Sequence, residues 1–331
     1  GPAPGGGREP IAEAALPLRI GARGATVRDL HRKLAEAGEF EIASTEEYTA
    51  ATAEAVKRFQ QSRGLPADGV CGAGTWAALV EAGHRLGDRL LYLRTPYQRG
   101  EDVADLQRRL GALGFSAGRV DGILGPDTGA AIGALQENAG LTADGICGPD
   151  TVAVLERIPS GDSHSMQMLL ERERLRSRPR LLSAAPIALA GADSLVEAAA
   201  RVLRRRGARV LVLAQREGSD VAAAANELDT SVLLDVQLAD GRSCETFYFE
   251  TAGFTSAGGK RLAEMLATAL GSVLDVPAAA AGMRLPLLRE SRMPAVACHL
   301  GPPPVVVEQQ AVLAERIAQC LADWIAEPLG S

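Results

Sequence analysis

The chain has 331 residues, enough for about two or three domains. Hydrophobic residues make up 47% and charged residues 23%, a balance typical of globular proteins. The formal net charge of -6 argues against nucleic acid as a partner, because phosphate binding needs a basic surface. No apolar run reaches the ~18 residues of a membrane span. No signal peptide with a basic start and an apolar centre opens the sequence.

The cysteines are odd in number and never spaced as C-x-x-C, so they indicate neither a disulfide framework nor a cysteine zinc site. We expect buried apolar thiols in a reducing compartment. The five are Cys71, Cys147, Cys244, Cys298 and Cys320.

Residues 1–16 are predicted to be a flexible segment, and an internal repeat follows them. Gly24 recurs as Gly100, an offset of 76, and many later positions keep this register without a gap. Such a register indicates two copies of one unit, which we place at 17–90 and 91–158. The recurring positions include Val27, Leu30 and Leu34 with Val103, Leu106 and Leu110, and Gln60 with Gln136.

Each repeat is predicted to contain three helices. Val103, Leu106, Leu110 and Leu113 follow the three-and-four spacing of a buried helix face. Asp-Gly pairs at 68–69, 121–122 and 144–145 predict turns, since glycine tolerates a positive φ. We expect Thr75 and Thr151 to cap the third helices.

These patterns resemble the three-helix peptidoglycan-binding module of bacterial wall hydrolases. The matching stretches are L-Q-x-x-L-x-x-L-G-F at 106–115, V-D-G-I-L-G-P-D-T at 120–128 and D-G-I-C-G-P-D-T at 144–151. The resemblance makes Asp121, Gly122, Asp144 and Gly145 candidates for ligand binding. The alternative is that these residues only build turns. In repeat 1 the loop at 44–49 departs from the pattern of its counterpart at 120–125.

Residues 159–180 begin with turn-forming residues and continue with alternating arginines, from Arg172 to Arg180. A solvated linker is predicted here. Docking to an acidic partner is the alternative.

From 181 to 327 strands alternate with helices. This order predicts an α/β domain with a central mixed sheet covered on both faces. The whole chain is thus expected to be two all-α repeats followed by an α/β domain. The expected strands are 187–190, 210–213, 232–236, 246–249 and 295–299, with helices near 193–206, 256–270 and 308–326.

The third domain resembles a zinc-type N-acetylmuramoyl-L-alanine amidase. The resemblance rests on D-T-S-V-L-L at 229–234, E-T-F-Y-F at 245–249 and M-P-A-V at 293–296. It implies a zinc ion held by two histidines and a glutamate, with a second glutamate as general base. Here residues 187–193 run almost directly from strand to helix, which leaves no counterpart for the first histidine and the ligand glutamate.

The family's second histidine falls on Asp235, and its catalytic glutamate on His299. The expectation is therefore a pseudo-amidase with no metal, no cofactor and no catalytic residue. Asp235 and His299 are expected to end neighbouring strands. An Asp–His hydrogen bond or two partly exposed polar residues are expected there, and a repurposed metal site is the alternative. Cys298 is predicted to point to the opposite face.

Two such repeats joined to a degenerate amidase domain resemble the CwlM-type proteins. That resemblance implies a non-catalytic cytoplasmic regulator of peptidoglycan synthesis. It implies two partners: MurA, the UDP-N-acetylglucosamine enolpyruvyl transferase that the regulator activates, and a serine/threonine kinase of the PknB kind. Thr45 and Thr49 are phosphorylation candidates, since they lie in the altered loop beside Glu46 and Glu47. The alternatives are a passive binder of peptidoglycan, a muropeptide or a peptidoglycan precursor, and an active amidase.

Overall fold

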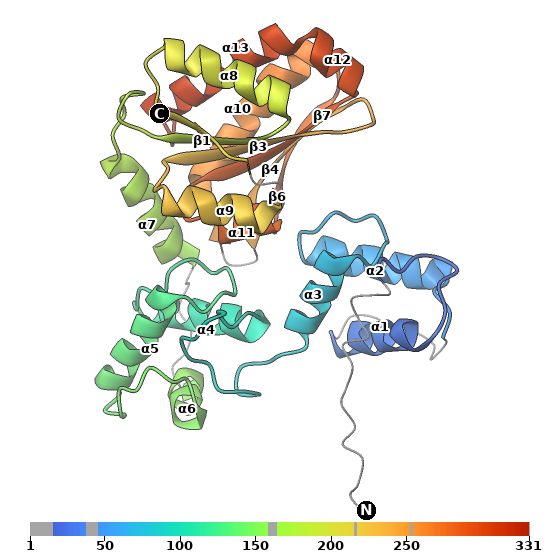
Figure 1. The fold of residues 1–331 in the computed structure, drawn as a ribbon. Coiled ribbons are helices and arrows are strands. Elements are labelled where there is room, and N and C mark those ends of the chain that lie inside the picture. Colours follow the sequence, from blue (N-terminus) through green and yellow to red (C-terminus); the bar gives the residue numbers. More distant parts are fainter. Residues whose placement is uncertain (1–15, 38–45, 158–163, 215–216, 252–253, 331) are drawn as a thin grey trace, which may run out of the picture. The chain divides into compact units, whose positions relative to one another are not determined.

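The computed structural model describes residues 16–37, 46–157, 164–214, 217–251 and 254–330 (Figure 1). The predicted flexible segment up to residue 15, and Thr45, lie outside the described residues. The chain divides into two compact units. The first comprises residues 1–107 and 122–158, and the second comprises residues 108–121 and 159–331. Within the described ranges, no helix combines the length and the apolar character needed to cross a bilayer.

Repeat 1 consists of three helices, α1 (Ala25–Glu36), α2 (Ala50–Ser62) and α3 (Ala73–Ala82). Its core includes Leu30 and Leu34, which confirms the predicted face of the first helix. Leu79 of α3 completes the contact between the helices. The same core takes in Leu18, Val27, Tyr48, Val56, Phe59 and Cys71.

Repeat 2 follows the same plan with α4 (Glu101–Ala112), α5 (Pro126–Asn138) and α6 (Pro149–Arg157). Each helix begins 76 residues after its counterpart in repeat 1, as the sequence register predicts. Leu106 and Leu110 are both fully buried, which confirms the predicted face of α4.

The expectation that Thr75 and Thr151 cap the third helices is wrong. Both are the third residue of their helix, and Gly72 occupies the N-cap of α3. Their hydroxyls are buried and accept hydrogen bonds from Gln60 at 3.0 Å and Gln136 at 3.1 Å. The threonines therefore serve as acceptors for a buried amide rather than as helix caps.

The α/β domain is built on a seven-stranded mixed sheet, as predicted. β2, β1, β3 and β7 run parallel, β4 lies antiparallel to β7, and β6 lies parallel to β4. The short β5 pairs with the end of β4. The strands are β1 (Ile187–Gly191), β2 (Val210–Val212), β3 (Val232–Leu238), β4 (Ser243–Thr251), β5 (Phe254–Thr255), β6 (Ala278–Met283) and β7 (Ala295–Gly301).

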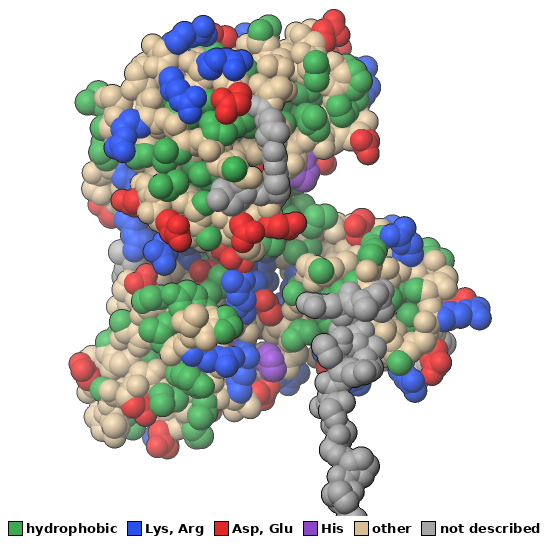
Figure 2. Space-filling model, in the orientation of Figure 1, with side chains coloured by type: hydrophobic (Ala, Val, Ile, Leu, Met, Phe, Trp, Pro, Cys, Tyr) green, Lys and Arg blue, Asp and Glu red, His purple; other side chains and the backbone are tan. Residues whose placement is uncertain are grey.

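Helices cover both faces of this sheet (Figure 1). On one face lie α8 (Asp193–Arg205), α10 (Ala257–Leu274) and α13 (Gln310–Ala326), whose apolar stripes form the main core with the sheet. On the other lie α9 (Gly218–Glu227) and α11 (Pro286–Glu290). The remaining helices are α7 (His164–Ser177), within the predicted linker, and α12 (Pro303–Glu308). Charged side chains of both signs are scattered over the visible surface (Figure 2).

Candidate functional site

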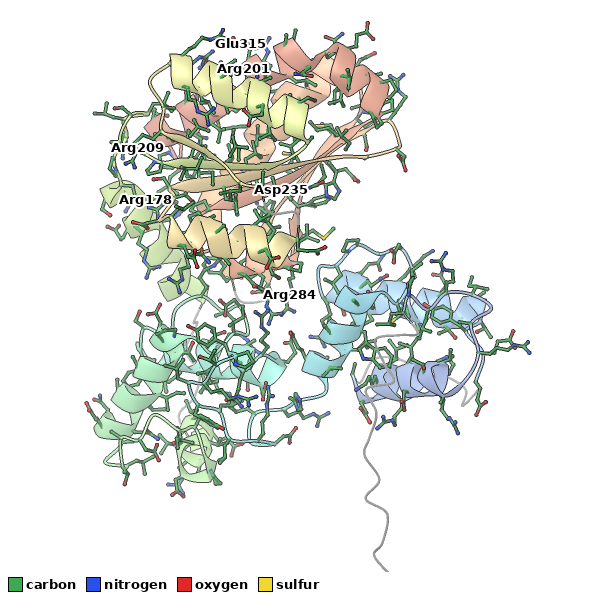
Figure 3. The ribbon with its side chains drawn as sticks, viewed as in Figure 1. Arg178, Arg201, Arg209, Asp235, Arg284 and Glu315 are labelled. Carbon is green, nitrogen blue, oxygen red and sulfur yellow. The ribbon has the colours of Figure 1, made fainter. Side chains whose placement is uncertain are left out.

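The face of the sheet beneath α9 and α11 carries the residues that the amidase resemblance singles out. Successive strand residues point to opposite faces, so the two sides of β3 differ in character. Val232, Leu234 and Val236 enter the core with α8, α10 and α13. Asp235 therefore projects from the other face, within the span of the sheet (Figure 3).

The strand register brings four polar residues together on this face. Asp235 of β3 pairs with Ala297 of β7, and Gln237 pairs with His299. On the other side, His299 pairs with Glu245 of β4. Gln237, His299 and Glu245 thus form a row across three strands, with Asp235 diagonal to the histidine. Both Asp235 and His299 lie within their strands rather than at the strand ends.

Asp235 and His299 have separate partners. Gln237 donates from Nε2 to both carboxylate oxygens of Asp235, at 3.0 and 3.1 Å. Asp235 is only 9% exposed, so these bonds replace part of the lost hydration of its carboxylate. The His299 ring meets the Phe247 ring nearly edge-on, with centroids 5.0 Å apart. The side chains are therefore held by Gln237 and Phe247 rather than by a bond to each other.

The junction between β1 and α8 is as short as the sequence predicted. β1 ends at Gly191 and α8 begins at Asp193, so only Ala192 lies between them. Gly191 has a φ of 102°, and a Cβ there would overlap the carbonyl oxygen of Val236. The amide of Ala192 donates to that oxygen at 2.6 Å. This turn is too tight to include a loop that bears metal ligands at the carboxyl end of β1.

These residues do not fit the zinc ion that the amidase resemblance implies. Catalytic zinc takes three protein ligands and keeps one position open for water. The face offers a carboxylate that already accepts two hydrogen bonds from an amide, and a histidine diagonal to it. Within the described ranges, no group of three or more His, Cys, Asp or Glu residues is arranged to hold a metal ion.

The cysteines are buried and free. Cys298 lies in the core with Val236, on the face opposite to Asp235, as predicted. Burial raises the pKa of the Cys71 and Cys147 thiols to about 12, and that of Cys244 and Cys320 to about 11. Such thiols are poor nucleophiles and poor metal ligands, because both roles require the thiolate.

In repeat 2, Asp144 and Gly145 form a turn that is held by Gln136. The amide of Gln136 donates to the Asp144 carboxylate at 2.8 Å, and its oxygen accepts from the Gly145 N–H at 2.9 Å. The hydrogen bond from the Ile146 N–H, and then that from Gln136, lower the pKa of Asp144. These contacts support a turn-building role, although the Asp144 side chain remains exposed.

The candidate turn at Asp121 and Gly122 is likewise held by hydrogen bonds to a glutamine. Gly122 has a φ of 70° and donates its N–H to Gln107 at 2.9 Å. Gln107 also donates to the carbonyl of Ile123 at 3.0 Å and to the hydroxyl of Thr128 at 3.1 Å. Asp121 offers its backbone carbonyl to Arg289 at 2.6 Å. The repeat register includes Gln136 but not Gln107, whose counterpart in repeat 1 is His31, and it gives no indication that either glutamine holds a turn.

Thr49 is the N-cap of α2. Its hydroxyl accepts from the Thr52 N–H at 3.3 Å, and the Thr52 hydroxyl accepts from the Thr49 N–H at 3.2 Å, which makes a reciprocal capping box. The residue is exposed. Glu46 and Glu47 nearby form ion pairs with Arg28 at 3.2 Å and Arg23 at 2.9 Å.

Comparison with known proteins identifies the repeats. The family described as "Putative peptidoglycan binding domain" matches residues 23–79 and 99–155. Over 182 residues the chain is 36% identical to the N-acetylmuramoyl-L-alanine amidase CwlM of Mycobacterium tuberculosis, which covers 50% of this chain and 44% of that protein. These matches confirm the resemblance to CwlM.

A second relative is the N-acetylmuramoyl-L-alanine amidase CwlL of Bacillus licheniformis, 31% identical over 149 residues, which covers 38% of this chain and 41% of that protein. The chain thus spans less than half the length of the curated relatives it matches.

Solved structures of two amidases are also similar to this chain. The N-acetylmuramoyl-L-alanine amidase of Clostridium difficile is 20% identical with a TM-score of 0.37, covering 44% of this chain and 98% of its own. Ami1 of Mycobacterium smegmatis is 13% identical with a TM-score of 0.38 and the same two coverages. The peptidoglycan-binding repeats and the match to CwlM identify the chain as a peptidoglycan-related, amidase-like protein.

Proposed function

We propose that this chain is a non-catalytic cytoplasmic regulator of peptidoglycan synthesis, which binds and activates MurA under the control of threonine phosphorylation. The main support for a loss of catalysis is that a single residue separates β1 from α8. The resemblance to CwlM supports the choice of MurA and of a PknB-kind kinase as partners.

The geometry of the sheet supports an amidase-like fold that serves in binding rather than in catalysis. A metal amidase needs three ligands around an open coordination position. At the corresponding place this chain has the tight turn at Gly191, a carboxylate hydrogen-bonded to Gln237 and a histidine packed on Phe247. None of these groups polarises a water molecule as the family's chemistry requires.

Thr49 is the phosphorylation site that we propose within the described residues. Thr49 is exposed at the N-terminus of α2, where backbone N–H groups and the helix dipole favour negative charge. A phosphoryl group adds about -1.5 to -2 charge and three strong acceptor oxygens. Phosphorylation would therefore keep the cap while it turns an already acidic loop into a strong ligand for arginines.

The decisive experiment titrates the full chain into a MurA assay, with and without prior phosphorylation by the kinase. We expect the phosphorylated form to raise the MurA rate and to form a complex measurable by calorimetry. Thr49→Ala should abolish the dependence on phosphorylation, and Thr75→Ser, at a buried hydroxyl, is the control. If neither form changes the rate or binds, the regulator proposal is wrong.

Two further assays separate the alternatives. Pelleting with purified sacculi would identify a passive peptidoglycan binder if the chain is retained while MurA is unaffected. Release of stem peptide from muropeptides that stops on addition of a chelator would identify an active amidase. We expect turnover equal to that of a blank in this second assay.

A further inference from the structure

The second unit contains a cavity of about 40 Å³ that is lined by arginines (Arg178 is labelled in Figure 3). Two of them, Arg174 and Arg178, come from α7 and the residues after it, Arg292 precedes β7, and Arg119 lies in the loop after α4. Glu171 is the carboxylate among the lining residues, and Phe254 forms part of the apolar wall. Four arginines and one carboxylate residue thus line the same cavity.

Glu171 does not neutralise these arginines through hydrogen bonds. Its Oε1 accepts from the hydroxyl of Ser256 at 2.7 Å, and its Oε2 accepts from the N–H of Ala257 at 2.9 Å. Ser256 is the N-cap of α10, so both carboxylate oxygens are engaged at the start of that helix. The cavity is therefore rich in donors and positive charge.

Among the described residues, two arginines of the cavity have only backbone carbonyl oxygens as hydrogen-bond acceptors. Arg178 donates to the carbonyl of Ser231 at 2.6 Å, and Arg119 donates to those of Ser291 and Leu288. Carbonyl oxygens satisfy N–H groups but carry no charge that would balance a guanidinium. The Nε of Arg119 is buried and has no hydrogen-bond partner among the described residues. Its guanidinium is stacked on the Phe249 ring, with the cation 4.3 Å from the centroid.

The other two arginines, Arg174 and Arg292, have exposed side chains. Neither guanidinium makes a hydrogen bond or an ion pair with any residue that the structure describes. Burial lowers the pKa of Arg119, although Glu171 and Asp121 partly offset this effect, and Arg174 lowers the pKa further. Burial likewise lowers the pKa of Arg178; Asp229 and Glu171 partly offset this effect, and Arg174 lowers the pKa further. Repulsion by the charge of Arg174 therefore lowers the pKa of both Arg119 and Arg178.

We propose that this arginine pocket binds a phosphate group. Guanidinium forks donate paired hydrogen bonds to the oxygens of a phosphate, and several of them together suit a dianion. The cavity volume of about 40 Å³ suits one phosphoryl group. Leu175, Met293 and Pro294 add apolar wall beside Phe254. The ligand is free inorganic phosphate or the phosphoryl end of a small monoester.

The test is calorimetric titration of the full chain with inorganic phosphate, at an ionic strength held constant with chloride. We expect one phosphate bound per chain. The double variant Arg174→Gln with Arg292→Gln replaces the two guanidiniums that have no described partners. It should weaken phosphate binding at least about ten-fold, because each substitution removes charge-assisted hydrogen bonds. Arg172→Gln is the control, because it removes a guanidinium charge from the exposed surface of α7 outside the pocket.

A parallel titration with glycerol phosphate separates the two sources. Tighter binding than inorganic phosphate would assign a monoester that uses the apolar wall, and weaker binding would assign the free anion. The proposal is wrong if phosphate gives no binding heat. It is also wrong if the double variant retains the affinity, or if Arg172→Gln loses it to the same extent. The substituted arginines lie on the surface, and the melting temperature of each variant checks that the fold is retained.

Discussion

In both repeats, a buried glutamine at the same register position holds the turn before the third helix through hydrogen bonds. Gln60 donates to the Asp68 carboxylate at 2.9 Å and to the Val70 carbonyl at 3.0 Å, and its oxygen accepts from the Gly69 N–H at 2.9 Å. Gln136 makes the corresponding three contacts at 2.8, 3.0 and 2.9 Å. A buried amide with every bond made is expensive to alter, so this part of the module holds its geometry.

The repeats differ at the loop before their second helix. In repeat 2, Gln107 fastens the loop through Gly122, and the helix begins with Pro126 behind a glycine N-cap. In repeat 1 the equivalent of Gln107 is His31, which is hydrogen-bonded to Thr52 at 3.0 Å, and a threonine caps the helix. The turn before the third helix is the same in both repeats, whereas the loop before the second helix differs. We therefore expect a difference in function between the repeats to lie in this loop.

The largest effect is expected at an ion pair between Arg89, which precedes repeat 2, and Asp102 of repeat 2, where repeat 1 has an uncharged residue. Arg89 donates to both oxygens of Asp102 at 2.7 and 3.0 Å, and the Asp102 side chain is fully buried. Arg89→Leu should cost about 3–5 kcal/mol, because it leaves a buried carboxylate unpaired. The measurement is the free energy of unfolding from urea denaturation, with hydrogen exchange of α4 amides to localise the loss.

The control for that variant comes from repeat 1, where Thr26 stands at the position of Asp102 and carries no charge. Adding Asp102→Thr to Arg89→Leu copies repeat 1, removes the stranded charge and should recover much of the lost stability. A double variant as unstable as Arg89→Leu would show that the packing of the arginine, rather than the ion pair, is what stabilises repeat 2.

The next effect tests whether the two cores are equivalent. Leu34 and Leu110 occupy the same register position and are both fully buried. Leu34→Ala and Leu110→Ala should each cost ~2–5 kcal/mol, because each leaves a cavity. Hydrogen exchange of α1 and α4 amides measures the two losses separately. A loss below ~1 kcal/mol at either position would mean that this helix face packs loosely.

The smallest effect sharpens the difference between the loops. Thr49→Ala should cost about 1 kcal/mol, because the first turn of α2 loses its side-chain acceptor. Thr49→Gly, which copies the N-cap of α5, should cost only a few tenths of a kcal/mol. Exchange rates of α2 amides report both changes. Equal losses in the two variants would contradict the role assigned to the cap.

Local patterns predicted most of the regular elements. The apolar runs at β1, β3 and β7 and the helical stripes of α8, α10 and α13 were all identified from periodicity. β6 was missed, because four alanines, a glycine and a methionine give no strand signal of their own. It forms a strand because β4 offers it a free edge with which to pair. α7 formed where the sequence predicted a solvated linker.

The sequence by itself determined the repeats, their register and the short junction at Gly191, because helix periodicity, turn residues and loop length are local properties. The tertiary structure decided the rest. It set Asp235 diagonal to His299 through the pairing of β3 with β7, and it made buried acceptors of Thr75 and Thr151. It also places arginines from three separate segments of the chain around one cavity. Residues far apart in the chain meet only through packing and strand pairing, which no local pattern specifies.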